Sequence, residues 1–191
     1  MLLRLPFIYF KAMKLDFKAF YFSAIVPELM TFKMYSSYHQ VPKILKICIN
    51  RGLKAITKEL DFAKRDLILI TGQKPKTTKV KKSVARFKIR DGMIVGNSVT
   101  LRGRRMYSFL EKLIHIDLPR VRNFKGVKTG GDRTGNYSIG INDQLVFPEI
   151  PYDNANRRRG FDISIVTSAS TVKESFRLLR SFGMPFATSL H

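Results

Sequence analysis

Acidic residues are scarce in this chain, which has 14 Asp and Glu against 35 Lys and Arg in 191 residues. The formal net charge is +21 and the pI is near 10.4. Such an excess opposes compaction unless a polyanion neutralises it. Nucleic-acid phosphates and anionic membrane surfaces are the plausible polyanions. The imbalance therefore predicts a polyanionic partner and favours nucleic acid.

Cysteine is almost absent as well. The single Cys48 excludes an internal disulfide, and it excludes the usual zinc sites, which need several closely spaced Cys or His. The three histidines, His39, His115 and His191, are far apart. No run of about 18 apolar residues is present, so we expect no transmembrane helix. We predict no metal site, no cofactor and no membrane partner.

Apolar residues make up 45% of the chain, which is enough for a core. The length predicts one domain, at residues 21–191. Residues 1–20 form a basic, aromatic N-terminal extension that lacks the serines of a plastid transit peptide and the cleavage site of a secretory signal. The spacing of its phenylalanines predicts an amphipathic helix.

Apolar periodicity predicts an α+β fold, in which helices pack on one face of an antiparallel sheet. Thr171 and Glu174 form a capping box for a last helix, and Gly183 and Pro185 end it. Leu45, Ile47 and Ile49 are the predicted inward residues of the first strand. The predicted helices cover 21–33, 54–69 and 104–116, and the predicted strands cover 43–50, 84–89, 95–102, 137–141 and 161–165.

Two of these strands carry polar and basic residues opposite their apolar ones. If helices cover the apolar face, the other face stays open and can reach an RNA backbone or base edges. The side chains predicted there are Lys46, Asn50, Ser98, Thr100 and Arg102.

Two basic segments, residues 74–82 and 120–133, are predicted to be flexible loops that contact phosphates. They carry few aromatic residues, which favours structured RNA over stacked single strands. The first segment contributes Lys74, Lys76, Thr77, Thr78, Lys79, Lys81 and Lys82, and the second contributes Arg120, Arg122, Lys125 and Lys128.

Catalytic patterns are weak. The segment GVKTGGDR, residues 126–133, lacks the ending of a phosphate-binding loop. His115 lies among apolar residues, which is typical of a packed histidine. The acids Asp132, Asp143, Glu149, Asp153 and Asp162 are predicted to serve in turns or salt bridges. An RNA-acting enzyme and a free basic nucleic-acid-binding module remain the alternatives.

Several segments resemble the L-five family of large-subunit ribosomal proteins (universal name uL-five), of the bacterial and plastid type. The most specific are QVPKILKICINRGL at residues 40–53 and LILITGQKPKTTKVKKS at residues 67–83. Others follow in the same order, among them SVARFKIRDGMIVGNSVTLRGRRMYSFLEKLI, LPRVRNFKG, GNYSIGINDQLVFPEI, RGFDISIVTSA and FGMPF. The resemblance covers about residues 21–187.

This resemblance implies a non-catalytic role in the central protuberance of the large subunit. The family binds 5S rRNA, contacts large-subunit rRNA and approaches the P-site tRNA through a mobile basic loop. It also bridges to the small-subunit head protein S-thirteen, among other ribosomal proteins. The resemblance implies 5S rRNA contacts at Asn50, Gln73, Thr100 and Arg102, and we add Lys46 and Ser98 from the polar strand faces.

Two positions depart from the family pattern, because Lys54 and Arg86 stand where glycine is usual. We expect an altered turn at Lys54 and an added RNA contact or changed loop at Arg86. The details INRGL and FGMPF favour a plastid (chloroplast) ribosome over a mitochondrial one, as does the abundance of Phe, Lys and Ile, which is typical of an organelle gene rich in A and T. We expect the extension to contact organelle-specific rRNA or a neighbouring protein.

Overall fold

The computed structural model describes residues 16–53, 57–87, 89–129, 131–151 and 160–187. The predictions for residues 1–15, Lys54 and Asp153 lie outside the described residues. The helical segments are α1 (Phe17–Phe20), η2 (Tyr21–Ile25), α2 (Val26–Lys33), η3 (Tyr38–Gln40), α3 (Thr57–Thr71), η4 (Ala85–Phe87), α4 (Gly103–Lys112), η5 (Leu113–Asp117), α5 (Leu118–Arg120), η6 (Gln144–Val146) and α6 (Val172–Ser181). The strands are β1 (Ile44–Gly52), β2 (Lys76–Lys79), β3 (Ile94–Leu101), β4 (Tyr137–Ile141) and β5 (Phe161–Thr167).

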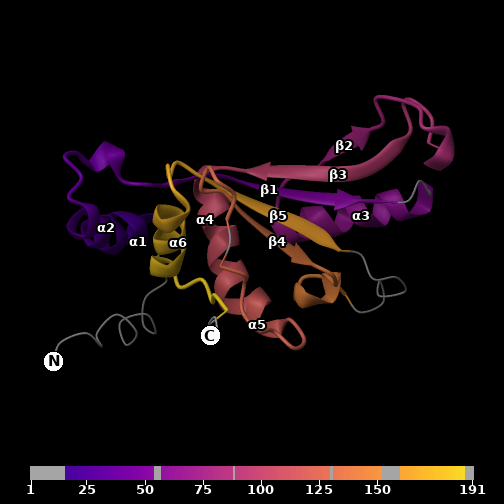
Figure 1. Cartoon of the computed structure of the whole chain (residues 1–191). Coiled ribbons are helices and arrows are strands. Elements are labelled where there is room, and N and C mark those ends of the chain that lie inside the picture. Colours follow the sequence, from indigo (N-terminus) through magenta and orange to yellow (C-terminus); the bar gives the residue numbers. More distant parts are fainter. Residues whose placement is uncertain (1–15, 54–56, 88, 130, 152–159, 188–191) are drawn as a thin grey trace.

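The five strands form one antiparallel sheet in the order β2-β3-β1-β5-β4. Helix α3 contacts β3 and helix α4 contacts β1, and both helices lie on the same side of the sheet (Figure 1). The predicted α+β fold with helices on one face is therefore confirmed.

Strand alternation builds the core on the helix-covered face. Ile47, Ile49 and Val99 point inward and are buried, together with Ile163 and Ile165 of β5. The apolar spacing of the predicted helix 104–116 places five residues on one side, and all of them are buried, namely Met106, Phe109, Leu110, Leu113 and Ile114. Phe17, the first residue of α1, lies in the same core with its ring 5.5 Å from that of Phe182. Residue 20, the predicted end of the extension, therefore lies within a continuous helical segment.

Two prolines lie inside helical segments, and each is preceded by a π-helical turn. Pro27 follows η2, and Pro119 follows η5. Proline cannot donate the usual backbone hydrogen bond, and its ring clashes with the carbonyl four residues earlier. A widened turn relieves both problems. The sequence predicts that the helix ends before Pro119, which is wrong, because it continues to Arg120.

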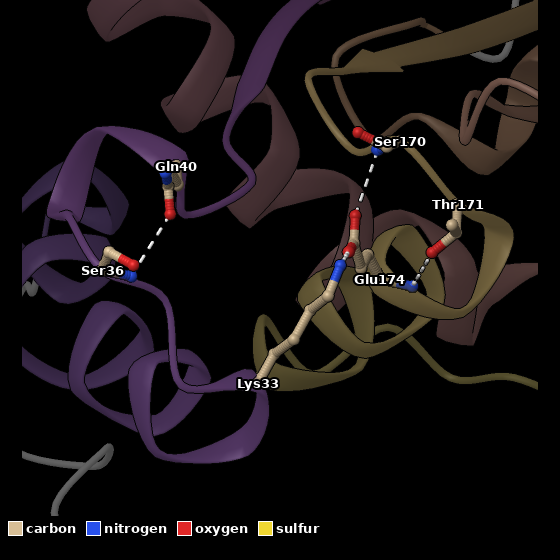
Figure 2. A network of polar contacts seen from close by, with 6 residues as sticks. All are labelled: Lys33, Ser36, Gln40, Ser170, Thr171 and Glu174. Carbon is tan, nitrogen blue, oxygen red and sulfur yellow. Dashed lines mark hydrogen bonds and ion pairs between the residues drawn. The ribbon is translucent and has the colours of Figure 1, made fainter.

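The predicted caps of the last helix are confirmed. Thr171 Oγ1 accepts a hydrogen bond from the Glu174 N–H, and the Glu174 carboxylate accepts one from the Ser170 N–H at 3.0 Å. Gly183 has a φ of +87°, and the Met184 N–H donates to the Leu179 carbonyl, as in a Schellman motif. Glu174 also pairs with Lys33, which joins the end of α2 to the start of α6 (Figure 2).

Three local predictions are wrong. A β-bulge between Ile44 and Lys46 turns Leu45 outward, so its side chain is 45% exposed and Ile44 is buried instead. The segment 84–89 is not a strand, because Val84 and Ile89 pair only with each other across the short η4 turn. Residues 76–79 of the predicted flexible loop form strand β2.

A buried ion pair fastens α3 to the sheet. Arg51 Nη1 of β1 lies 3.0 Å from Asp66 Oδ2 of α3, and both side chains are at most 1% exposed. The Arg51 guanidinium also stacks over the Phe161 ring, 4.2 Å from its centroid. Sequence periodicity does not reveal this pair, since Arg51 occupies an inward position where an apolar residue is usual.

We predict that Asp66→Ala lowers the free energy of unfolding by about 3–5 kcal/mol, because it leaves the Arg51 charge buried without its carboxylate. Urea denaturation measures this loss. Asp61→Ala, which removes an exposed carboxylate from the same helix, is the control and should change stability by less than about 0.5 kcal/mol. Equal effects of the two changes would contradict a structural role for the pair.

Candidate nucleic-acid interface

The sheet face opposite the helices presents rows of small polar and basic side chains. Directly paired residues of antiparallel strands point to the same side. One row runs from Lys76 through Ser98 and Asn50 to Asp162. The adjacent row runs through Thr100, Cys48, Ser164 and Ser138. We call these two rows, with Lys46, Gln73 and Arg102 beside them, the open face.

The six residues predicted to bind 5S rRNA come from three segments, and the structure brings them together. Lys46 and Asn50 lie on β1, and Ser98 and Thr100 lie on β3. Arg102 follows β3 directly, at the N-cap of α4. Gln73 follows α3, and its side-chain amide donates to the Thr100 carbonyl at 3.3 Å. All six side chains are at least partly exposed.

The basic segment 74–82 divides between the sheet and a loop. Lys76 pairs with Ser98 within the open face, and Thr78 pairs with Gly96 on the same side of the sheet. Thr77 points to the opposite face beside Asn97. Lys74, Lys79, Lys81 and Lys82 are exposed. The prediction that these residues form one flexible arm is therefore wrong for 76–79, which the β3 ladder holds in place.

Beyond β2 the chain forms a basic loop that leads to β3, which we call the β2–β3 loop (residues 80–93). Arg86 and Phe87 lie in the η4 turn, and the Phe87 side chain is 68% exposed. The Asp91 N–H donates to Ser83 Oγ at 3.0 Å, which holds the two sides of the loop together. Figure 1 shows this loop curling away from the helices.

The second basic segment also presents its cations to solvent. Arg120, Arg122, Lys125 and Lys128 are all exposed. The segment is tied to the C-terminal part of the chain, because Val127 forms a parallel bridge with Phe186. It begins at α5, which lies at the lower edge of the molecule, away from the β2–β3 loop at the upper right (Figure 1). The two basic segments can therefore contact different partners.

Acidic side chains mostly serve in turns and ion pairs, as predicted. Asp132 accepts hydrogen bonds from Thr134 and Asn136, and these bonds lower the pKa of its carboxyl. Asp143 accepts from the Leu145 N–H, and Glu149 pairs with Lys112 at 2.7 Å. Asp162 is different, because it lies on the open face of β5 and forms no salt bridge with another described residue.

The described residues offer no catalytic arrangement. Asp117 has a pKa raised to about 7 by burial, but its side chain is fully buried and cannot reach a substrate. His115 packs its ring 5.7 Å from that of Phe17, and partial burial lowers its pKa. It lines a mainly apolar groove of about 1280 Å³ between α2 and α6, where Glu28 is the one carboxylate among the described residues.

The described residues also lack a cluster of metal ligands and a membrane-spanning helix. No three His, Cys, Asp or Glu side chains among them lie close enough together to hold a metal ion. No helix among them has the length and apolar character needed to cross a bilayer.

Sequence reasoning missed three residues of the open face, namely Ser138, Asp162 and Ser164, and it assigned Lys76 to the flexible loop instead of the sheet. The alternation within 137–141 and 161–165 indicates which side chains point outward, since the polar residues occupy every second position. Their proximity to Asn50 and Thr100 depends on strand order, which the local pattern does not encode.

The fold and the open face define a basic α+β protein whose sheet has one face free of helices. Residues 37–90 match the family model described as ribosomal protein L5, and residues 94–186 match the model of the ribosomal L5P family C-terminus. The chain belongs to the ribosomal protein L5 family. It is thus a structural component of the large ribosomal subunit and not an enzyme.

Individual relatives cover most of the chain. A large ribosomal subunit protein uL5c from Emiliania huxleyi is 56% identical over 177 residues, which are 91% of this chain and 97% of that protein. A uL5 protein from Lactiplantibacillus plantarum is 55% identical, covering 89% of this chain and 97% of its own length. A uL5c protein from Rhodomonas salina is 51% identical, covering 91% and 98%.

We predict that Gly96→Ala disrupts the sheet beneath the open face. An added Cβ would lie 2.4 Å from the Arg51 carbonyl oxygen and 2.9 Å from Thr78 Oγ1, so β1, β2 and β3 would have to separate. We expect a loss of about 1–3 kcal/mol in urea denaturation. Gly52→Ala is the matched control, because an added Cβ there meets no atom within 4 Å. Unchanged stability of the Gly96 variant would contradict this close packing.

Proposed function

We propose that this protein binds 5S rRNA in the central protuberance through its open face. The observation that carries the proposal is the meeting of Asn50, Gln73 and Thr100 with Lys46, Ser98 and Arg102 on one helix-free surface. Uncharged groups there can hydrogen-bond to bases and sugars, and the cations can neutralise phosphates. A sheet face free of helices can approach the wide, shallow minor groove of an RNA helix.

The β2–β3 loop, with the exposed lysines of β2, approaches the P-site tRNA in this proposal. Support comes from the exposed cations at Lys74, Lys79, Lys81 and Lys82 and from the projection of the loop away from the helices (Figure 1). The sequence assigns Lys76, Thr77 and Thr78 to the same contact, and these residues lie in β2, at the base of the β2–β3 loop. Arg86 adds a further exposed cation at its end.

The segment from Arg120 to Lys128 contacts large-subunit rRNA and bridges to the small-subunit head protein S-thirteen. Its exposed cations and its position far from the β2–β3 loop support a separate partner. Other central-protuberance proteins are further partners. The N-terminal extension contacts a neighbouring protein or organelle-specific rRNA. The likeness to two algal proteins named uL5c supports a plastid ribosome as the location.

We predict that Asn50→Ala combined with Thr100→Ala weakens 5S rRNA binding by roughly 10- to 100-fold at every salt concentration, since two uncharged hydrogen-bonding groups are lost. Filter binding across a salt series measures this. The slope of log affinity against log salt should stay the same, because no cation is removed. Both side chains are at least partly exposed on the sheet surface, so we expect the double variant to fold.

The matched variant replaces Lys79, Lys81 and Lys82 by Gln. It should leave 5S rRNA binding nearly unchanged and reduce tRNA-dependent effects in reconstituted ribosomes. If the loop variant lost 5S rRNA binding as fully as the sheet variant, this division would be wrong. Equal binding of duplex DNA by the unaltered protein would instead indicate a general basic nucleic-acid-binding module.

A further inference from the structure

Asp162 is the one acidic side chain on the strands of this sheet among the described residues. It is exposed at the end of the row that starts at Lys76, next to Asn50 across the β1–β5 ladder. A carboxylate at a surface that faces phosphates costs free energy through repulsion. The net charge of the chain is +21, so its sign is opposite to that of this side chain.

No described residue of the protein neutralises this carboxylate. Asp162 takes part in no ion pair and no hydrogen bond among the described residues, and neither does the Asn50 side chain. Lys76 is the cation of the same row, but it lies three strands away, which is about 14 Å at the usual strand spacing. Both side chains therefore keep their hydrogen-bonding capacity for an outside partner.

Glycines leave the space around the pair empty. Gly140 is the direct neighbour of Asp162 on β4, and an added Cβ there would meet only Asp162 Oδ1, at 3.9 Å. Gly52 lies two residues beyond Asn50, and an added Cβ there meets nothing within 4 Å. Packing within the described residues thus does not require glycine at either position. Glycine weakens a strand, and it often marks a place where another molecule approaches the backbone closely.

The chemistry of an ionised carboxylate limits what it can bind, because it only accepts hydrogen bonds. RNA surfaces consist mainly of acceptors. In the shallow minor groove, the donors are the 2′-hydroxyls and the exocyclic amino group of guanine. Asn50, beside the carboxylate, can donate to the acceptors that flank this amino group.

We propose that Asp162 and Asn50 recognise a guanine of the bound RNA, with the Asp162 carboxylate accepting a hydrogen bond from the guanine 2-amino group. This inference rests on the proposed binding of 5S rRNA and makes Asp162 a specificity-determining residue within it. The surrounding cations attract any RNA. The Asp162 carboxylate lowers the affinity for every RNA sequence that has no hydrogen-bond donor at this point.

The test compares Asp162→Ala and Asp162→Asn with the unaltered protein in 5S rRNA binding. Removing a bystander acid from an RNA interface would tighten binding, because repulsion falls. We expect the opposite, with affinity falling about 10-fold or more for Asp162→Ala and less for Asp162→Asn, whose amide oxygen still accepts a neutral hydrogen bond. Asp61→Ala on α3, across the sheet from the open face, is the control and should bind as tightly as the unaltered protein.

Interference mapping with inosine, which lacks only the 2-amino group of guanine, identifies the base. We expect one or two guanines whose replacement weakens binding to the unaltered protein but not to Asp162→Ala. Interference from 2′-deoxy nucleotides alone would overturn guanine recognition, as would equal or tighter binding by both Asp162 variants. Failure of the unaltered protein to bind 5S rRNA would instead overturn the proposed function.

Discussion

The ion pair between Arg51 and Asp66 fixes the orientation of the central strand, and the open face depends on that orientation. Neighbouring residues of a strand point to opposite sides, so an inward Arg51 requires Asn50 and Gly52 to point outward. A slip of one residue would bring Asn50 into the core and expose Ile49. Because a buried arginine without its carboxylate is strongly unfavourable, the pair excludes such registers more firmly than apolar burial alone does.

Alternation within single strands was sufficient to predict half of the open face. The patterns around Ile47 and Val99 place Asn50, Ser98 and Thr100 on polar faces, and the register of β1 and β3 confirms that they meet. The error at Leu45 has a local cause, since the bulge adds a residue to the strand and shifts the alternation. A bulge leaves little trace in the sequence, because isoleucine and leucine are equally apolar.

The remaining part of the open face could not be predicted, because it depends on which strands become neighbours. Asp162 lies more than a hundred residues after Asn50, and nothing local shows that β5 pairs with β1. The same limit applies to Lys76 and Thr78. Their segment is short, basic and poor in apolar residues, so its own composition favours a loop, and only the hydrogen bonds to β3 make it a strand. Arg51 and Asp66 also meet only through the packing of α3 on the sheet.

The molecule therefore has two kinds of polar surface, which the net charge of the chain does not distinguish. The exposed cations of the β2–β3 loop and of the segment at 120–128 lie in connections outside the sheet, where long side chains can adjust to a phosphate backbone. Most amides and hydroxyls of the open face, with Asp162 and two lysines, lie on strands whose positions the core fixes. Phosphate attraction needs little geometric precision, whereas hydrogen bonds to bases and sugars need a rigid support. A basic protein can in this way be selective, because its charge draws in any nucleic acid but its sheet fits only a few.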